Sequence, residues 1–292
     1  MPIRLRDIEN PHSVITPIDS KTRFPESIEE SMKKYRASIG FFNAMIQSSS
    51  SSAQLLAKIR AQTPAPRRMS LLKLFRRCVA PIIDTEMAKK VRTVSTETLV
   101  DSYGASFKPI SKLKQQFANL SESEITALVV LLGEYDGRGL EGYQLTETFF
   151  DWFEEKFPNE FSISGPRGAG PDIELVTVFP DFKGSYPCDF IIKDRTETVV
   201  AIGFARYDST RGGSQSDDRT GGNANKIDKA QRYCEDSGKS FRLIFVADGP
   251  GLAHRDTWAE AVYIDGAWGD NVRVTTLKLA ESLITPEWLS NS

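Results

Sequence analysis

The chain has 292 residues, 40% of them hydrophobic and 26% charged, and a net charge of −2. This length allows one large domain or two ordinary domains, each with a genuine core. No apolar run approaches the roughly 18 residues of a membrane span, and residues 1–10 do not resemble a signal peptide. We therefore expect a cytoplasmic protein without a membrane partner. Three separated cysteines and two histidines argue against a disulfide framework or a zinc site.

The charge is distributed unevenly along the chain. Residues 1–120 hold 20 lysines and arginines against 10 acidic residues, whereas the remainder holds 17 against 29. A basic segment suits the neutralisation of phosphates, and an acidic half can supply carboxylates for a metal ion. Ordinary surface charge would explain the same numbers, so the asymmetry alone does not decide between them.

The first part of the chain has helical patterns. Apolar residues recur at helical spacing in residues 25–47, 53–61 and 70–92. Ser121 and Glu124 form a capping pattern before a further apolar run, and aromatic residues follow one face of residues 144–157. We expect residues 1–140 to form a mainly helical, basic region that clamps DNA, mediates dimerisation, or both.

The pattern changes after Gly165. Runs typical of strands cover residues 173–179, 188–193 and 198–207, and a helix over 226–237 and a buried strand over 241–247 follow. The expected fold class is therefore α/β (α+β). A helical N-terminal region precedes a mixed β-sheet core, flanked by helices, in residues 141–292.

This order of elements resembles the common core of the PD-(D/E)XK nucleases, which include many type II restriction endonucleases. In that family an aspartate, often after proline, lies at the second strand, and an (Asp/Glu)-x-Lys tripeptide lies on the third. Here Pro187-Cys188-Asp189 matches the first element, one residue out of the strict pattern. The resemblance implies that Asp189 is catalytic and binds Mg²⁺, the hard cation that lowers the pKa of an attacking water.

The third strand departs from the family pattern. Gly203 and Ala205 occupy the positions of the acidic residue and the lysine, and alternation places both on one face of the strand. Three explanations are open: the acidic group comes from elsewhere, the domain has lost catalysis, or a carboxylate at position 203 has been replaced so that DNA is bound uncut. The last explanation predicts that Gly203→Glu creates cleavage.

Other residues could supply the missing groups. Glu174 follows a glycine-rich turn, as in some restriction and mismatch-repair nucleases, and is a second possible metal ligand; Glu154 and Glu155 are weaker ones. Arg206, Lys193 or Lys226 would have to replace the lysine, although an arginine acts only electrostatically. A second alignment takes Pro171-Asp172 as the Pro-Asp pair and moves the tripeptide to Asp189-Phe190-Ile191, which also lacks the lysine.

The polar, glycine-rich segment 208–225 is expected to be a loop that contacts DNA, with a plain surface loop as the alternative. Arginine suits guanine, and asparagine or glutamine suits adenine. The predicted DNA-binding residues are Arg211, Gln215, Arg219, Asn223, Asn225 and Lys226. The glycines of residues 165–170 lack a following Lys-Ser/Thr, so no nucleotide cofactor is expected.

Together, these patterns favour a sequence-specific, Mg²⁺-dependent endonuclease that acts on double-stranded DNA as a homodimer. The alternative is a DNA-binding or interaction protein that uses a nuclease-like fold without catalysis. Magnesium and a restored carboxylate at position 203 would make no difference to such a protein.

Overall fold

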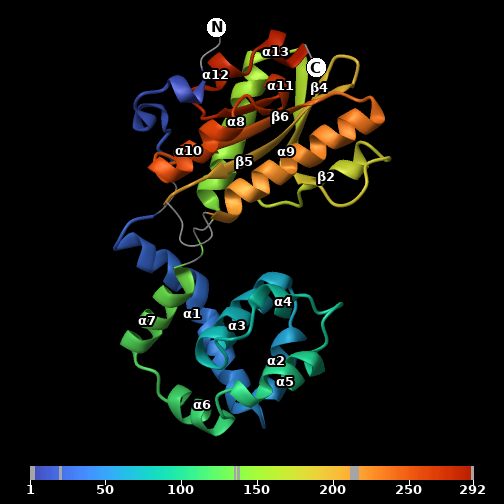
Figure 1. The fold of residues 1–292 in the computed structure, drawn as a ribbon. Helices are drawn as coiled ribbons and strands as arrows, with labels where there is room; N and C mark the ends of the chain where they lie inside the picture. The colour runs from blue at the N-terminus through green and yellow to red at the C-terminus, as the bar shows by residue number, and fades with distance from the viewer. Residues whose placement is uncertain (1–3, 20–21, 135, 137–138, 211–216, 291–292) are drawn as a thin grey trace. The chain divides into compact units, whose positions relative to one another are not determined.

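The computed structural model describes residues 4–19, 22–134, 136, 139–210 and 217–290, with the backbone alone for residues 217–221. The chain divides into two compact units. The helical unit comprises Lys21–Gly137, and the sheet unit comprises Met1–Ser20 together with Arg138–Ser292. Figure 1 shows the elements of both units.

The helical unit is built from helices packed around one apolar core. Its described helices are α1 (Glu26–Gln47), α2 (Ser52–Arg60), α3 (Ala65–Cys78), α4 (Thr85–Lys89), α5 (Thr96–Tyr103), α6 (Ile110–Phe117) and α7 (Glu122–Gly133). Phe42, Leu55 and Phe75 are fully buried between them. The expected capping box is present, because Ser121 and Glu124 each accept a hydrogen bond from the backbone N–H of the other.

Residues 70–92 have the helical structure expected from their pattern, divided into two helices. Helix α3 begins earlier, at Ala65, and ends at Cys78. Pro81 lies in the turn that follows, and Asp84 caps α4 by accepting hydrogen bonds from the N–H groups of Glu86 and Met87. A proline cannot donate the backbone hydrogen bond that a continuous helix would require there.

The sheet unit has the α+β architecture expected from the sequence. Its strands are β1 (Phe161–Ser164), β2 (Ile173–Glu174), β3 (Pro187–Cys188), β4 (Phe190–Asp194), β5 (Val199–Tyr207), β6 (Arg242–Asp248) and β7 (Val272–Thr275). Its helices are α8 (Leu140–Lys156), α9 (Asp217–Ser237), α10 (Arg255–Ile264), α11 (Ala267–Asp270), α12 (Ala280–Leu283) and α13 (Pro286–Ser290).

Five strands form the main sheet in the order β1-β4-β5-β6-β7. β1, β4 and β5 are antiparallel, whereas β5, β6 and β7 are parallel to one another. α9 makes the crossover from β5 to β6, and α10 lies in the connection from β6 to β7. The sheet is therefore mixed, with the parallel half built by helical crossovers.

Each face of the sheet is covered by its own helices. α8 lies on one face, where Phe149, Phe150 and Phe153 pack with Phe190 and Ile244. α9 and α10 cover the other face, where the core includes residues such as Ile227, Trp258, Phe204 and Phe245. Figure 1 shows α9 and α8 on the two sides of the strands.

The first expected strand, residues 173–179, is wrong. Only Ile173–Glu174 is extended, and it pairs with β3 in a separate two-stranded sheet. Leu175–Thr177 forms a 3-10 turn that buries Leu175 and leaves Val176 exposed, so packing overrides the strand preference of these residues. The first strand of the main sheet is β1. The sequence patterns indicated neither β1 nor β7.

The expected loop at residues 208–225 is wrong in its second half. Helix α9 begins at Asp217, nine residues before the helix predicted at 226. The glycines at 221 and 222 weakened the helical signal without preventing the helix.

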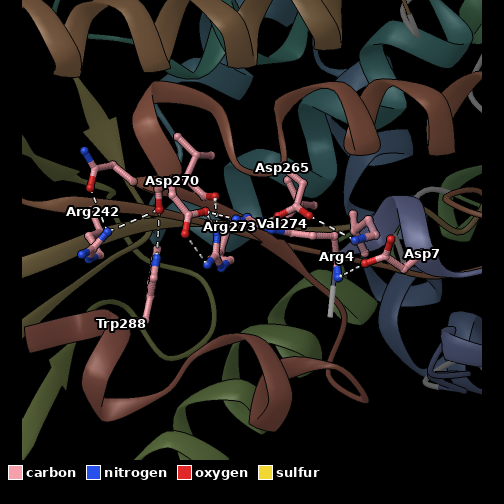
Figure 2. A network of polar contacts seen from close by, with 11 residues as sticks. Arg4, Asp7, Arg242, Asp265, Asp270, Arg273, Val274 and Trp288 are labelled. Atoms are coloured by element: carbon pink, nitrogen blue, oxygen red, sulfur yellow. Dashed lines mark hydrogen bonds and ion pairs between the residues drawn. The ribbon is translucent and has the colours of Figure 1, made fainter. Parts of the chain in front are cut away.

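Residues 4–18 form an N-terminal arm that belongs to the sheet unit, although the sequence grouped them with the helices. Leu5 is fully buried in the core beside α10. Figure 2 shows Arg4 paired with Asp270, which also binds Arg273 of β7. The N–H of Leu5 donates to Asp265, which also accepts from the N–H of Val274. Tertiary hydrogen bonds thus attach the arm, and its local sequence does not show them.

Candidate functional site

Asp189 lies between β3 and β4, and the backbone of β5 fixes its carboxylate. Its N–H donates to the carbonyl of Gly203 (2.9 Å), and its Oδ2 accepts from the N–H of Ala205 (2.7 Å). Gly165 approaches closely, because a Cβ there would lie 2.3 Å from the carbonyl oxygen of Asp189. The end of β1 therefore holds this corner of the sheet tightly, and the carboxylate has a defined position.

Lys226 of α9 lines the same cavity as Asp189, and its charge lowers the pKa of the Asp189 carboxyl. The Lys226 amine is 3.7 Å from the centre of the Phe204 ring, which is a cation–π distance. Burial lowers the pKa of the Lys226 amine, and the negative charges of Asp189 and Asp172 oppose that shift. A lysine with a lowered pKa gives up its proton more readily than an exposed one.

Burial has the opposite effect on Asp189. It raises the pKa of the carboxyl, and the hydrogen bond from Ala205 counteracts it. The charge of Asp172 raises this pKa further, whereas that of Lys226 lowers it. Two partly buried groups whose charged forms are both disfavoured by burial are typical of functional sites, although structural ion pairs can show the same pattern.

Asp172 joins this cluster from the loop after β1. Arg167 of the same loop bonds to carboxylates of α8, at 2.6 Å from Asp151 and 2.8 Å from Glu154, and stacks on Phe150. These contacts hold the loop to α8, and the charge of Asp172 in this loop affects the pKa values of Asp189 and Lys226. They also engage Glu154, one of the weaker expected metal ligands.

A cavity of about 340 Å³ adjoins Asp189 and Lys226. Residues of β5, β6, β7, α9 and α10 line it, so it lies between the sheet and the two helices of that face. Its apolar lining includes Phe245, Leu252, Ala261 and Ile264, and its polar lining includes Asp208, Asn223, Thr257 and Glu260. Helix α10 carried no motif in the sequence, so Thr257 and Glu260 were missed.

Gly203 does not face this site, which corrects the sequence-based prediction. A Cβ on Gly203 would lie 1.9 Å from Cζ of Phe190, inside the core on the α8 face. Asp189 lines the cavity with Phe204 and Arg206, on the opposite face. Alternation showed that Gly203 and Ala205 share a face but not which face, and a carboxylate at 203 would point away from Asp189.

The other expected catalytic residues have different surroundings. The Ala205 side chain packs on the α8 face, and only its N–H reaches Asp189. The Arg206 Nε donates to Asp208 (2.9 Å), so this arginine is engaged at the rim of the cavity. Glu174 accepts hydrogen bonds from Ser185 (2.8 Å) and the Tyr186 N–H (2.9 Å), and therefore braces the β2–β3 pair.

The expected DNA-binding residues are only partly brought together. Asn223 and Lys226 line the cavity, whereas Asn225 is exposed on α9. Arg219 belongs to the backbone of α9, and its side chain lies outside the description. Arg211 and Gln215 lie outside the described residues.

Within the described residues, no group of three or more His, Cys, Asp or Glu side chains is placed to hold a metal ion. Mg²⁺ commonly takes only one or two carboxylates and completes its shell with waters and phosphate oxygens. Asp189 supplies one such carboxylate, and a bound cation would offset the burial and the charge of Asp172 that raise its pKa. The residues present therefore fit one Mg²⁺ ion.

Comparison of the chain with protein-family models, curated proteins and solved structures found no match. None of the described helices has both the length and the hydropathy needed to cross a bilayer.

Proposed function

We propose that the sheet unit is the nuclease core of a Mg²⁺-dependent endonuclease of the PD-(D/E)XK type that cuts double-stranded DNA at specific sequences. One observation carries the proposal: Asp189 and Lys226 line one cavity, on a sheet in which β1, β4 and β5 precede α9 and β6. This is the order of elements that the family resemblance implies, with the aspartate at the start of the second strand.

The chain's own groups have separable roles in this proposal. Bound Mg²⁺ would neutralise charge on the scissile phosphate and acidify a water molecule. Asp189 would hold the ion, with Asp172 as the second candidate ligand. Lys226 replaces the lysine that β5 lacks, and positions the attacking water or accepts its proton, a role that the lowered pKa of its amine suits.

The proposal also covers the partners and the location. Cutting both strands with one site per chain favours a homodimer on a two-fold symmetric DNA site. The basic helical unit would bind the phosphates of the duplex, whose neutralisation dominates the affinity of such proteins. An enzyme that cuts intracellular DNA acts in the cytoplasm.

The test is a cleavage assay on long, mixed-sequence DNA with Mg²⁺, using the unmodified chain and single variants. We expect discrete fragments from the unmodified chain, and a loss of at least about 100-fold in rate for Asp189→Asn and Lys226→Met. Lys229→Met is the matched control, because Lys229 is exposed on the same helix. Equal rates for the two lysine variants would remove Lys226 from the mechanism.

A second candidate function is DNA binding without catalysis. The observation that favours it is Phe204, an apolar residue on β5 on the same face as Asp189, where catalysis would call for an acidic side chain. This reading predicts that the chain binds DNA equally with Mg²⁺ and with EDTA and yields no fragments. That result would overturn the endonuclease proposal.

A further inference from the structure

The cavity beside Asp189 and Lys226 is deeper than phosphate chemistry needs. Phe204 and Phe245 form its aromatic side, stacked with ring centres 5.1 Å apart. Leu252, Ala261 and Ile264 also belong to its apolar lining. A phosphodiester and a metal ion would use only charged and polar groups such as Asp189 and Lys226, so the apolar lining favours a further, partly apolar occupant.

Size and chemistry limit what this occupant can be. The volume of about 340 Å³ lies at the lower end of ligand pockets, which span roughly 300–1,000 Å³. It suits a flat, partly apolar group with a few hydrogen-bonding atoms. Asn223, Thr257 and Glu260 line the same cavity and offer amide, hydroxyl and carboxylate groups, the types of side chain that recognise the edges of nucleobases.

The occupant must also lie close to a phosphate. In a nucleotide, one sugar joins the phosphate to the base, so a phosphate at Asp189 and Lys226 brings its own base to the mouth of the cavity. A base that remains stacked in a duplex cannot enter a cavity between α9 and α10. Enzymes that bind a single base in this way rotate it out of the stack, at a cost of a few kcal/mol for unstacking.

We propose that this cavity receives one nucleobase of the bound DNA, rotated out of the duplex, while the adjoining phosphate lies at Asp189 and Lys226. The inference rests on the proposed nuclease function and adds a base-binding site to it. Asn223 and Glu260 select the base by hydrogen bonding to its edge. The ligand is part of the DNA strand and not a free cofactor.

The test measures base binding separately from cleavage. The probe is 2-aminopurine deoxyribonucleoside 5′-monophosphate, whose fluorescence changes on stacking, titrated to millimolar concentration with the full chain and Mg²⁺. Ala261→Phe fills the cavity, and Ala259→Phe makes the same change at an exposed position of α10. We expect Ala261→Phe to weaken binding at least tenfold and Ala259→Phe to leave it unchanged.

Two further measurements keep the result decisive. Asn223→Ala removes a polar group without filling the cavity, and we expect severalfold weaker binding even if Ala261→Phe folds poorly. Deoxyribose 5-phosphate, which lacks a base, should compete at least tenfold less well than the mononucleotide. Equal competition, or equal affinity of Asn223→Ala, Ala261→Phe and Ala259→Phe, would overturn the proposal.

The two proposals fail in different ways. If Ala261→Phe cleaves DNA at the rate of the unmodified chain, the nuclease proposal holds and the base-pocket proposal is refuted. If the unmodified chain cuts no DNA, the nuclease proposal is refuted, and so is the base pocket as a part of a nuclease. Mononucleotide binding by such a chain would then mark a base-binding site of a non-catalytic protein.

Discussion

Asp248 provides the sharpest test of how the sheet unit is held together. Its carboxylate is fully buried at the end of β6 and accepts three backbone hydrogen bonds. Oδ1 accepts from the N–H groups of Thr16 (2.7 Å) and Gly249 (2.8 Å), and Oδ2 accepts from that of Leu277 (3.0 Å). One side chain thus joins the N-terminal arm, the end of β6 and the segment after β7.

The magnitude follows from these three bonds. A hydrogen bond to a charged acceptor contributes about 1.5–3 kcal/mol, and a buried donor left without a partner costs about 1–3 kcal/mol. Because the three donors are not independent and water can reach some of them, we expect Asp248→Ala to lower the free energy of unfolding by about 4 kcal/mol. This is a large share of the roughly 5–15 kcal/mol of a typical domain.

Asp248→Asn should lower the free energy of unfolding by about half as much as Asp248→Ala. The amide oxygen can still accept from Thr16 and Gly249, but the amide nitrogen then faces the Leu277 N–H, and two donors meet. We therefore expect a loss of about 2 kcal/mol. Asp228→Ala, at an exposed position of α9, is the control and should stay within about 0.5 kcal/mol of the unmodified chain.

Tryptophan fluorescence during urea unfolding is the appropriate assay. The four tryptophans of the chain are Trp152, Trp258, Trp268 and Trp288, and all belong to the sheet unit. The signal therefore reports this unit separately from the helical unit, which matters because a two-unit chain need not unfold in one step. A loss below about 1 kcal/mol for Asp248→Ala would refute the reasoning.

Two further stability predictions use the same assay. Hydrogen bonds from Arg273 and Arg4 hold the pKa of the Asp270 carboxyl below its usual range. The pairing therefore stabilises the folded state fully above the unfolded-state pKa near 4, and this stabilisation is lost as the pH falls through the folded-state pKa. Because the Asp270 side chain is 43% exposed and solvent screens its charge, Asp270→Asn should lower the free energy of unfolding by only about 1 kcal/mol at pH 7, and by progressively less below pH 4. A pH-independent loss would contradict this. Gly203→Ala should lower the free energy of unfolding by about 1–3 kcal/mol, because the added Cβ forces Phe190 away. Gly142→Ala, which has open space around it in α8, is the control and should be neutral or stabilising. An alanine tolerated at position 203 would mean that the faces of the strand are assigned wrongly.

The sequence alone determined those features that depend on local chemistry. Apolar periodicity indicated α1 and α2, the Ser121 pattern indicated the start of α7, and continuous apolar runs indicated β5 and β6. The resemblance to the PD-(D/E)XK core singled out Asp189, and this residue lines a cavity. Such signals are read within a few residues, so they survive without knowledge of the fold.

Tertiary structure alone decided which residues meet. Alternation paired Gly203 with Ala205, but only the packing of Phe190 against α8 determined the face they occupy. Lys226 lines the same cavity as Asp189 because the crossover helix α9 returns over the sheet. The N-terminal arm joins the sheet unit through Asp248 and Asp270. These contacts join residues far apart in the chain, and their partners depend on how the strands and helices pack, which no local pattern encodes.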